Sequence, residues 1–461
     1  MLYSSPLPYQ ADASAYFAAI RDLSWAAWLD SGGSGRFDIL VAQPVVTIIT
    51  QGEQTEIRDA SGTRISAGDP FTVLREQLGE PIAAMPDIPF AGGVLGYWSY
   101  DLARRYHRMP SIAQDAEHVP EIAVGIYDWA IILDHQQWSA RLVSRQRYAE
   151  TAKVLPQILQ RLNSVHFPTE KGEKFRVQGG IASNLSYIAY RSAFDVVQEY
   201  LHEGDCYQVN LAQRYAAQAS GDAFTAYLEL RDLSPAPYSA FLDWPQVQIL
   251  CASPERFLQV QQGRVETRPI KGTRGRSADA AEDARLAQEL REHPKDRAEN
   301  LMIVDLLRSD LGKSCEPGSV RTPKLFEVES FANVHHLVST VIGELQSGCD
   351  ALDVLRDCFP GGSITGAPKQ RAMEIIEQLE PHRRGVYCGV IGYAGFDGNM
   401  DTNIAIRTLV YSNKVIRCWA GGGVVADSKC EAEYQETLDK ASGMLEILRR
   451  FGGEMANHSG K

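Results

Sequence analysis

Runs of hydrophobic residues in the first third of the chain predict β-strands. They lie at residues 36–50, 92–100 and 123–134 and are rich in Ile, Val, Thr and aromatic residues, which favour an extended backbone. A short helical pattern at 13–19 and a Gly-rich turn at 31–35 precede them. Strands that follow one another with only turns between them indicate an antiparallel β layer.

The rest of the chain alternates helical and strand patterns. Apolar residues recur every three or four positions at 149–163, 186–203, 280–311, 368–379 and 431–450. Ser186 can cap the second of these helices, and Pro294 divides the third into two. Strands are predicted at 207–215, 247–252, 257–260, 389–395, 404–410 and 415–420. The pattern favours antiparallel sheets faced by helices, and the polar stretch 164–174 is the best candidate linker.

The composition is that of an ordinary globular protein, with 44% hydrophobic and 23% charged residues in a chain of 461. The net charge of −12 offers no basic surface to nucleic acid or to an anionic membrane. No apolar run approaches the length needed to cross a bilayer, and the first 19 residues lack a basic start followed by an apolar core. Eight cysteines include no Cys-x-x-Cys pair. We therefore expect a cytoplasmic protein with reduced thiols, in which local cationic sites bind any anionic ligand.

Lys271 lies between two residues that shape the backbone. Pro269 fixes one backbone dihedral, and Gly272 admits conformations that other residues avoid. A desolvated lysine beside other cations, here Arg268 and Arg274, has a lowered pKa and a larger nucleophilic fraction at pH 7. The stretch predicts either a reactive lysine or a solvated loop whose lysine is inert.

Carboxylates on two predicted helices form a candidate metal site. Glu433, Glu436 and Lys440 are spaced i, i+3 and i+7, which places them on one helix face. Glu299 lies two residues before the apolar run 301–304, where a charge needs a partner or a metal ion. Carboxylates that converge from two helices suit Mg²⁺, although each glutamate taken singly also fits a solvated helix surface.

Glycine-rich segments and isolated polar residues complete the candidates. The turn 361–369 leads into a helix and exposes N–H groups that favour an anion, and the glycines 421–423 let a ligand approach the backbone. Both are equally consistent with tight turns. His336 suits proton handling or a structural role. Tyr393 and Arg407 lie on neighbouring strand patterns, and Arg407 is a natural partner for a carboxylate.

Taken in order, these stretches resemble the chorismate-utilising enzymes, and among them the aminodeoxychorismate synthases. The matching segments are 204–211 (GDCYQVNL), 253–256 (SPER), 268–273 (RPIKGT), 296–310 (DRAENLMIVDLLRSD), 334–339 (VHHLVS), 360–369 (PGGSITGAPK), 401–408 (DTNIAIRT) and 420–440. The resemblance implies an α+β fold in which antiparallel β-sheets pack as a sandwich with helices on the outer faces. It also implies an N-terminal β-rich region at 1–165, packed together with a chorismate-binding catalytic region at 180–455.

By position, the resemblance implies roles for individual residues. Lys271 would be the nucleophile, Glu255 the general acid near the C4 hydroxyl of chorismate, and His336 its neighbour. The implied Mg²⁺ ligands are Glu299 and Glu436, with Glu433 binding directly or through water. The implied substrate contacts are Tyr393, Arg407, Gly421, Gly422, Gly423, Lys440, Thr402 and Gln208.

Two positions separate the members of the family. Relatives that add water at C2 resemble one another in carrying a lysine where this chain has Gln208, and anthranilate synthases usually have alanine where it has Lys271. Gln208 with Lys271 resembles the aminodeoxychorismate synthases, which implies conversion of chorismate and ammonia to 4-amino-4-deoxychorismate through a Lys271 adduct at C2, for 4-aminobenzoate and folate synthesis. Anthranilate synthase component I and a catalytically silent amino-acid-binding subunit are the alternatives.

The chain shows no glutaminase signature, because no cysteine lies in a nucleophile-elbow context with a following His/Glu pair. The resemblance therefore implies a separate glutamine amidotransferase subunit that supplies ammonia. It also implies a candidate tryptophan pocket in the β core, at Ser31, Phe37, Pro237 and Tyr238.

Overall fold

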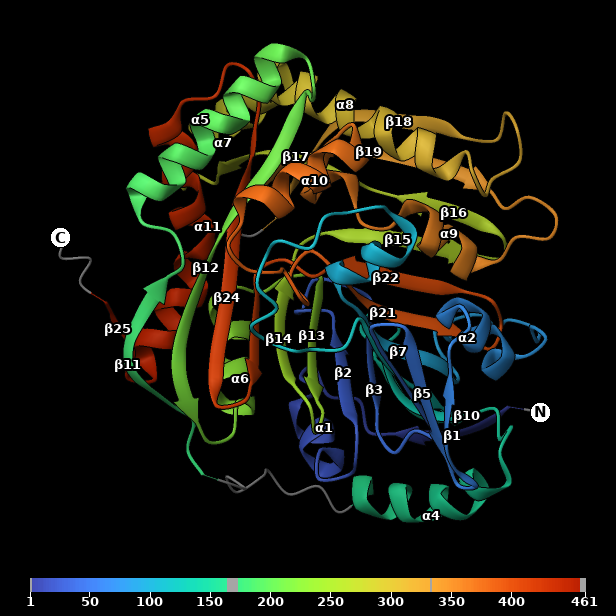
Figure 1. The fold of residues 1–461 in the computed structure, drawn as a ribbon. Coiled ribbons are helices and arrows are strands. Elements are labelled where there is room, and N and C mark those ends of the chain that lie inside the picture. The colour runs from blue at the N-terminus through green and yellow to red at the C-terminus, as the bar shows by residue number, and fades with distance from the viewer. Residues whose placement is uncertain (1, 164–172, 332–333, 457–461) are drawn as a thin grey trace.

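Two large sheets form the protein, as the computed structural model of residues 2–163, 173–331 and 334–456 shows (Figure 1). In order across the first sheet, the strands are β1 (Tyr3–Leu7), β10 (Ser139–Ser144), β9 (Trp129–Asp134), β3 (Phe37–Val41), β2 (Ala26–Asp30), β13 (Tyr238–Asp243), β14 (Gln248–Ser253), β23 (Thr408–Ser412), β24 (Val415–Val424), β12 (Gln208–Ser220), β11 (Arg176–Ser183) and β25 (Glu454–Met455), with β20 (Gly366–Ala367) paired to β12. All pairings are antiparallel except that of β11 with β25.

The second sheet is antiparallel throughout its described pairings. Its strands run in the order β17 (Ile270–Gly275), β19 (Val334–Glu344), β16 (Arg264–Thr267), β15 (Arg256–Gln261), β22 (Met400–Ile404), β21 (Val390–Gly395), β7 (Gly93–Trp98), β8 (Ile122–Tyr127), β4 (Val46–Gln51), β5 (Gln54–Asp59) and β6 (Gly62–Ser66), with β18 (Arg321–Ser330) paired to β19. The largest hydrophobic core lies between the two sheets and contains residues from both.

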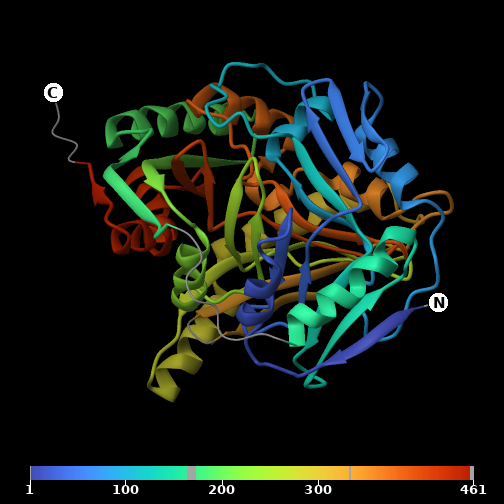
Figure 2. The same cartoon turned by 90° about the horizontal axis from the view of Figure 1, so that it is seen from below.

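Helices cover the outer faces. They are α1 (Ser14–Ile20), α2 (Pro70–Leu78), α3 (Ala103–Tyr106), α4 (Ala149–Asn163), α5 (Tyr187–Glu203), α6 (Phe224–Leu233), α7 (Ala280–Glu292), α8 (Pro294–Leu311), α9 (Ala351–Cys358), α10 (Lys369–Leu379) and α11 (Cys430–Arg450), with short 3₁₀ turns η1 (Tyr100–Leu102) and η2 (Gly362–Ile364). Figure 1 shows α11 alongside β24 and α8 above β19. Figure 2 shows α4 beside the N-terminal strands, where its apolar face joins a second core with α1 and α6. The predicted α+β sandwich with helices on its outer faces is confirmed. None of the described helices is long and apolar enough to span a membrane.

The predicted helices are confirmed, whereas some predicted strands are divided. Ser186 accepts a hydrogen bond from the Ala189 N–H and caps α5, and Pro294 begins α8 as expected. The runs 36–50 and 123–134 each contain two strands that belong to different sheets, β3 with β4 and β8 with β9. The strand predicted at 404–410 is wrong, because β22 ends at Ile404 and Arg407, with φ of 49°, lies in the crossing to β23. Apolar residues such as Ala405 and Ile406 lie within the crossing itself, so hydrophobicity does not mark where the chain changes sheet.

Both sheets contain strands from residues 1–165 and from residues 180–455. The predicted linker 164–174 lies, up to residue 172, outside the described residues.

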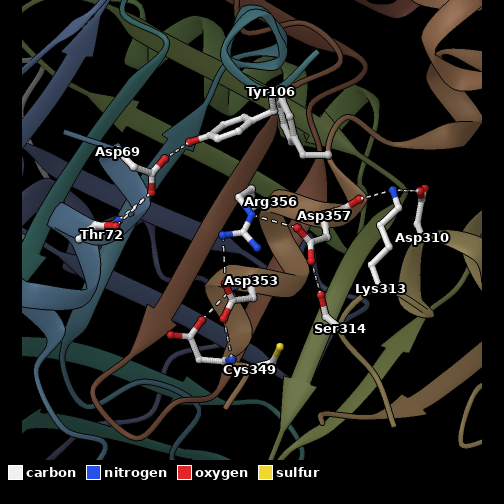
Figure 3. A network of polar contacts seen from close by, with 12 residues as sticks. Asp69, Thr72, Tyr106, Asp310, Lys313, Ser314, Cys349, Asp353, Arg356 and Asp357 are labelled. Atoms are coloured by element: carbon white, nitrogen blue, oxygen red, sulfur yellow. Dashed lines mark hydrogen bonds and ion pairs between the residues drawn. The ribbon is translucent and has the colours of Figure 1, made fainter. Parts of the chain in front are cut away.

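A polar network fixes the C-terminal end of α8 (Figure 3). Asp357 on α9 accepts hydrogen bonds from Ser314 (2.6 Å) and from Arg356 (2.9 Å). Asp310 accepts from Lys313 (3.0 Å) and from the buried amine of Lys369 on α10 (2.6 Å). Three helices are thereby held together at the end of α8.

We expect Trp28→Ala to be strongly destabilising. The indole is fully buried, contacts Phe17 and Tyr227, and lies 5.0 Å beneath the guanidinium carbon of Arg231. Replacing a buried Trp with Ala costs about 3–5 kcal/mol. Urea unfolding should show this loss, whereas Trp138→Ala, at a side chain that is 70% exposed, should change the free energy by about 1 kcal/mol or less. Equal losses in the two variants would contradict the assignment of Trp28 to the core.

Candidate active site

Lys271 is on β17, at the edge of the second sheet. Gly272 follows it with φ of +82°, and a Cβ there would lie 2.9 Å from Leu290 Cδ1 and 2.9 Å from Asp296 Cγ. The prediction that glycine shapes this stretch is confirmed, because a larger residue would push β17 away from α7 and α8.

Charges of both signs surround Lys271. Burial lowers the pKa of its amine, although the nearby Glu299 and Glu255 carboxylates oppose the shift. The Lys440 ammonium adds to the lowering. The net direction increases the fraction of neutral, nucleophilic amine.

The expected cause of this shift was partly wrong. Arg268 pairs with Glu329, and Arg274 pairs with Glu289 (3.1 Å) and Asp296 (3.1 Å). Each guanidinium is already paired with a carboxylate. The pKa of Lys271 is therefore lowered by burial and by the Lys440 charge, and not by these arginines.

Glu255 lies in the turn from β14 to β15 and is buried. Its Oε1 accepts a hydrogen bond of 2.8 Å from Ser363 Oγ on η2. Burial raises the pKa of this carboxyl, although the Ser363 bond and the Lys271 charge oppose the shift. A carboxyl with a raised pKa can retain a proton and donate it, as a general acid must.

His336 on β19 is buried, and its Nδ1 lies 2.9 Å from Thr273 Oγ1. Burial lowers the pKa of the imidazole to about 4, and the positive charge of Arg407 contributes. His336 is therefore neutral at pH 7 and can share hydrogen bonds without adding charge.

Carboxylates of α8 and α11 converge. The Lys295 amine lies 3.9 Å from an oxygen of Glu299 and 3.9 Å from one of Glu433. Glu436 pairs with Lys440 at 2.6 Å. A Cβ on Gly422 would lie only 3.0 Å from Glu433 Oε2, so the glycine allows this carboxylate to approach β24.

The donor chemistry of this cluster fits a hard divalent cation. Burial raises the pKa of Glu299 and of Glu433, whereas the Lys440 pair lowers that of Glu436 against the effect of burial. Glu433 Oε2 is buried without a hydrogen-bond partner, and a cation would satisfy it. Within the described ranges, no three His, Cys, Asp or Glu side chains are already gathered around a metal position.

The glycines Gly421, Gly422 and Gly423 lie on β24 opposite β12. β24 pairs with β23 only as far as Cys418, so one edge of the strand beyond it has no strand partner in the described chain. Lys440 donates to the Gly421 carbonyl at 3.0 Å. Backbone groups at such an open edge can bind a ligand.

Gln208 projects towards this glycine segment from β12. A Cβ on Gly423 would lie 3.0 Å from Gln208 Cδ. The side chain is fully buried, yet neither its amide oxygen nor its nitrogen has a hydrogen-bond partner. An unpaired buried amide is costly unless a ligand satisfies it.

Arg407 is an uncompensated cation at the same site. It makes no side-chain hydrogen bond and no ion pair with any residue that the structure describes. Together with Lys440 it lines a cavity of about 430 Å³ between α6 and α11. A ligand carboxylate would supply the missing counter-charge.

The structure places Tyr393 and Thr402 elsewhere. Both line a cavity of about 480 Å³ between the sheets, because alternate residues of a strand face opposite sides. Tyr393 lies opposite Asp401 in the β21–β22 pairing. The hydrogen bond from Cys388 N to Ala405 O (2.9 Å) continues this pairing towards Tyr387 and Arg407. Tyr393 and Arg407 therefore line different cavities.

The cavity between the sheets contains most of the candidate tryptophan pocket. Phe37, Pro237 and Tyr238 line it, and so does Asp30. Ser31 does not, and its buried hydroxyl has no hydrogen-bond partner. The structure brings these segments together, and ligand binding there stays a prediction.

Sequence reasoning missed Ser363 and Lys295. Ser363 lies in the stretch 361–369, which was singled out for its glycines. The lysine of that stretch, Lys369, is held by Asp310.

Comparisons with known proteins agree on one family. The model of the family described as chorismate binding enzyme matches residues 26–446. The chain is 48% identical to aminodeoxychorismate synthase component 1 of Klebsiella aerogenes, over 96% of this chain and 98% of that protein. It is 47% identical to the protein of the same name from Escherichia coli (strain K12), over 96% and 97%. Its fold is similar to the crystal structure of anthranilate synthase component I from Streptococcus pneumoniae TIGR4, with a TM-score of 0.80 and 32% identity over 89% of this chain and 92% of that one.

We expect the His336 imidazole to titrate near pH 4, its pKa in the buried site. The measurement is NMR of ¹³C-labelled histidine, with His336→Gln to assign the signal. Arg407→Gln should move the midpoint upwards, because it removes a positive charge that opposes protonation. A wild-type midpoint near the ordinary value of about 6.5 would contradict the burial of this side chain.

Proposed function

The chain belongs to the family of chorismate binding enzymes, and from this we propose that it converts chorismate and ammonia to 4-amino-4-deoxychorismate with Lys271 as a covalent nucleophile. The observation that carries the proposal is the Lys271 amine, whose pKa burial lowers, beside a Glu255 carboxyl whose pKa burial raises. The lowered pKa suits Lys271 as a nucleophile, and the raised pKa suits Glu255 as a general acid. The names printed for the relatives with 47% and 48% identity support the same reaction.

In the first step, the neutral Lys271 amine attacks C2 of chorismate. The two ring double bonds shift by one position each, the C4–oxygen bond breaks, and Glu255 gives a proton so that the hydroxyl leaves as water. This role of Glu255 is that of a general acid, because hydroxide is a poor leaving group. The attacking nitrogen loses a proton and remains bonded to C2.

In the second step, ammonia adds at C4. The double bonds return to their first positions, the bond between C2 and the Lys271 nitrogen breaks, and a proton released by the added ammonia returns to the amine. The sum is chorismate plus ammonia giving 4-amino-4-deoxychorismate plus water. The lysine is regenerated, as covalent catalysis requires.

The substrate carboxylates find complementary groups at the site. Arg407, which has no partner among the described residues, would bind the enolpyruvyl carboxylate. The ring carboxylate would meet Lys440 and the open edge of β24 at the glycines. Mg²⁺, held by Glu299 and Glu436 with Glu433 nearby, would supply positive charge to the ring carboxylate and assist departure of the C4 oxygen.

We further propose that a glutamine amidotransferase subunit supplies the ammonia. The words "component 1" in the names of the relatives support a multicomponent enzyme. The reaction would belong to 4-aminobenzoate and folate synthesis in the cytoplasm.

Intact-mass spectrometry with chorismate and Mg²⁺, in the absence of ammonia, tests the covalent step. We expect an adduct of chorismate minus water on the native protein and none on Lys271→Ala. The same variant should lose most amination with ammonia and still bind chorismate in isothermal titration. Full amination by Lys271→Ala would overturn the covalent mechanism, and a fluorescent anthranilate product would assign the chain to the alternative reaction instead.

Glu299→Gln tests the metal site. Loss of a charged ligand should raise the Mg²⁺ concentration at half-maximal activity by about tenfold or more. Glu292→Gln, on the exposed face of α7, is the matched control and should leave the titration unchanged. Identical metal titrations for the native protein and Glu299→Gln would rule out a site between α8 and α11.

A further inference from the structure

The connection between α10 and β21 contains an ion pair that is buried on both sides. The side chains of Arg384 and Glu380 are 1% and 4% exposed. Two hydrogen bonds, of 2.6 Å and 2.9 Å, join the guanidinium to the carboxylate. A buried ion pair stabilises a fold little relative to apolar residues of the same volume. The specific role of this ion pair therefore lies in the segments that its other hydrogen bonds connect.

One of these bonds reaches η2. Arg384 Nη1 donates to the Ile364 carbonyl at 2.8 Å. Ile364 directly follows Ser363, whose hydroxyl donates to the Glu255 carboxylate at 2.8 Å. The position of the Ser363 hydroxyl thus depends on a turn that the guanidinium holds.

Other bonds reach β12. Arg384 Nη2 donates to the Asn210 carbonyl at 2.8 Å, and Glu380 Oε1 accepts from the Ala212 N–H at 2.9 Å. Gln208, with its unpaired amide, is two residues before Asn210 on this strand. The ion pair therefore joins the strand that carries Gln208 to the turn that carries Ser363.

The guanidinium also contacts aromatic rings. It lies 4.9 Å from the centroid of Tyr100 and 5.7 Å from that of Tyr387, which itself stacks on Trp419 of β24. These rings enclose the ion pair and exclude water, which strengthens its hydrogen bonds.

We propose that Arg384 and Glu380 form a clamp that positions Ser363, and through it the Glu255 carboxyl, relative to Gln208 on β12. The inference rests on the proposed function in so far as Glu255 is the general acid. Arg384 is a positioning residue: it acts on the site through Ser363 and Asn210. A purely structural pair would affect stability and leave the properties of Glu255 unchanged.

Arg384→Lys is the first test. Lysine keeps the charge but cannot bond Glu380 and two carbonyls in one plane. We expect kcat to fall by about 10- to 100-fold with KM changed little, because the acid is displaced. The basic limb of the kcat–pH profile should move to higher pH, since a weakened Ser363 bond no longer favours the ionised Glu255 carboxylate.

A double-mutant cycle tests whether Arg384 acts on Glu255 through Ser363. Ser363→Ala should give the same shift of the pH profile, and adding Arg384→Lys to it should lower kcat little further. Fully independent effects would overturn positioning through Ser363. Glu380→Gln keeps the size of the side chain and should give the same changes in kcat and in the pH profile as Arg384→Lys. It serves as the test variant if Arg384→Lys does not fold.

Hydrogen exchange of the protein without substrate tests the clamp independently of the proposed function. Arg384→Lys, or Glu380→Gln in its place, should speed exchange of the backbone amides at 208–212 and 361–367. Arg417→Lys is the matched control, because this buried arginine of β24 pairs with Glu117 (3.1 Å) and donates to Ser412 (3.1 Å), away from η2 and Asn210; it should leave those amides as in the native protein. Unchanged exchange in the folded clamp variant would overturn the clamp. If the native protein does not aminate chorismate, the proposed function fails, and this measurement still decides the clamp.

Discussion

The charge balance around the half-buried Lys271 side chain is the constraint on which the arrangement of the site depends. A charge that is partly removed from water is stabilised by opposite charge, and the Glu255 and Glu299 carboxylates come from two distant parts of the chain to provide it. Glu255 is in the turn that joins β14 of the first sheet to β15 of the second, and Glu299 is on α8. Because both must be close to β17, the packing of α8 against β17 and β19 follows from the same requirement. The network at the C-terminal end of α8 fixes that helix in place.

The second sheet separates two compartments that differ in chemistry. On the side of the cavity between the sheets lie Ile270 and Arg256, each next in sequence to a candidate catalytic residue. Lys271 and Glu255 themselves belong to the polar cluster with α8 and α11. Strand alternation produces this division, because adjacent side chains face opposite sides of a sheet. A shift of the β17 or β15 backbone would therefore change both the cavity between the sheets and the polar cluster.

Several polar groups at the candidate site lack a partner among the described residues. The chain carries a net charge of −12, yet Arg407 has no carboxylate partner and Gln208 has an unpaired amide, both within the described chain. Glu433 Oε2 is likewise unpaired. The proposed anionic substrate and divalent cation would satisfy this cation, this amide and this carboxylate oxygen. Arg268 and Arg274, in contrast, are paired with carboxylates.

The sequence by itself determined the helices, the fold class and the family, because periodicity, caps and motifs are local. Ser186, Pro294 and Gly272 act through the backbone of their own segments, so their effects could be predicted and were found. Only the tertiary structure decided where the chain changes sheet and which cations remain free. Those properties depend on strand register and on partners more than a hundred residues away, such as Ser363 for Glu255. A residue's neighbours along the chain fix its conformation, whereas its charge state and its contacts are set by residues that folding brings to it.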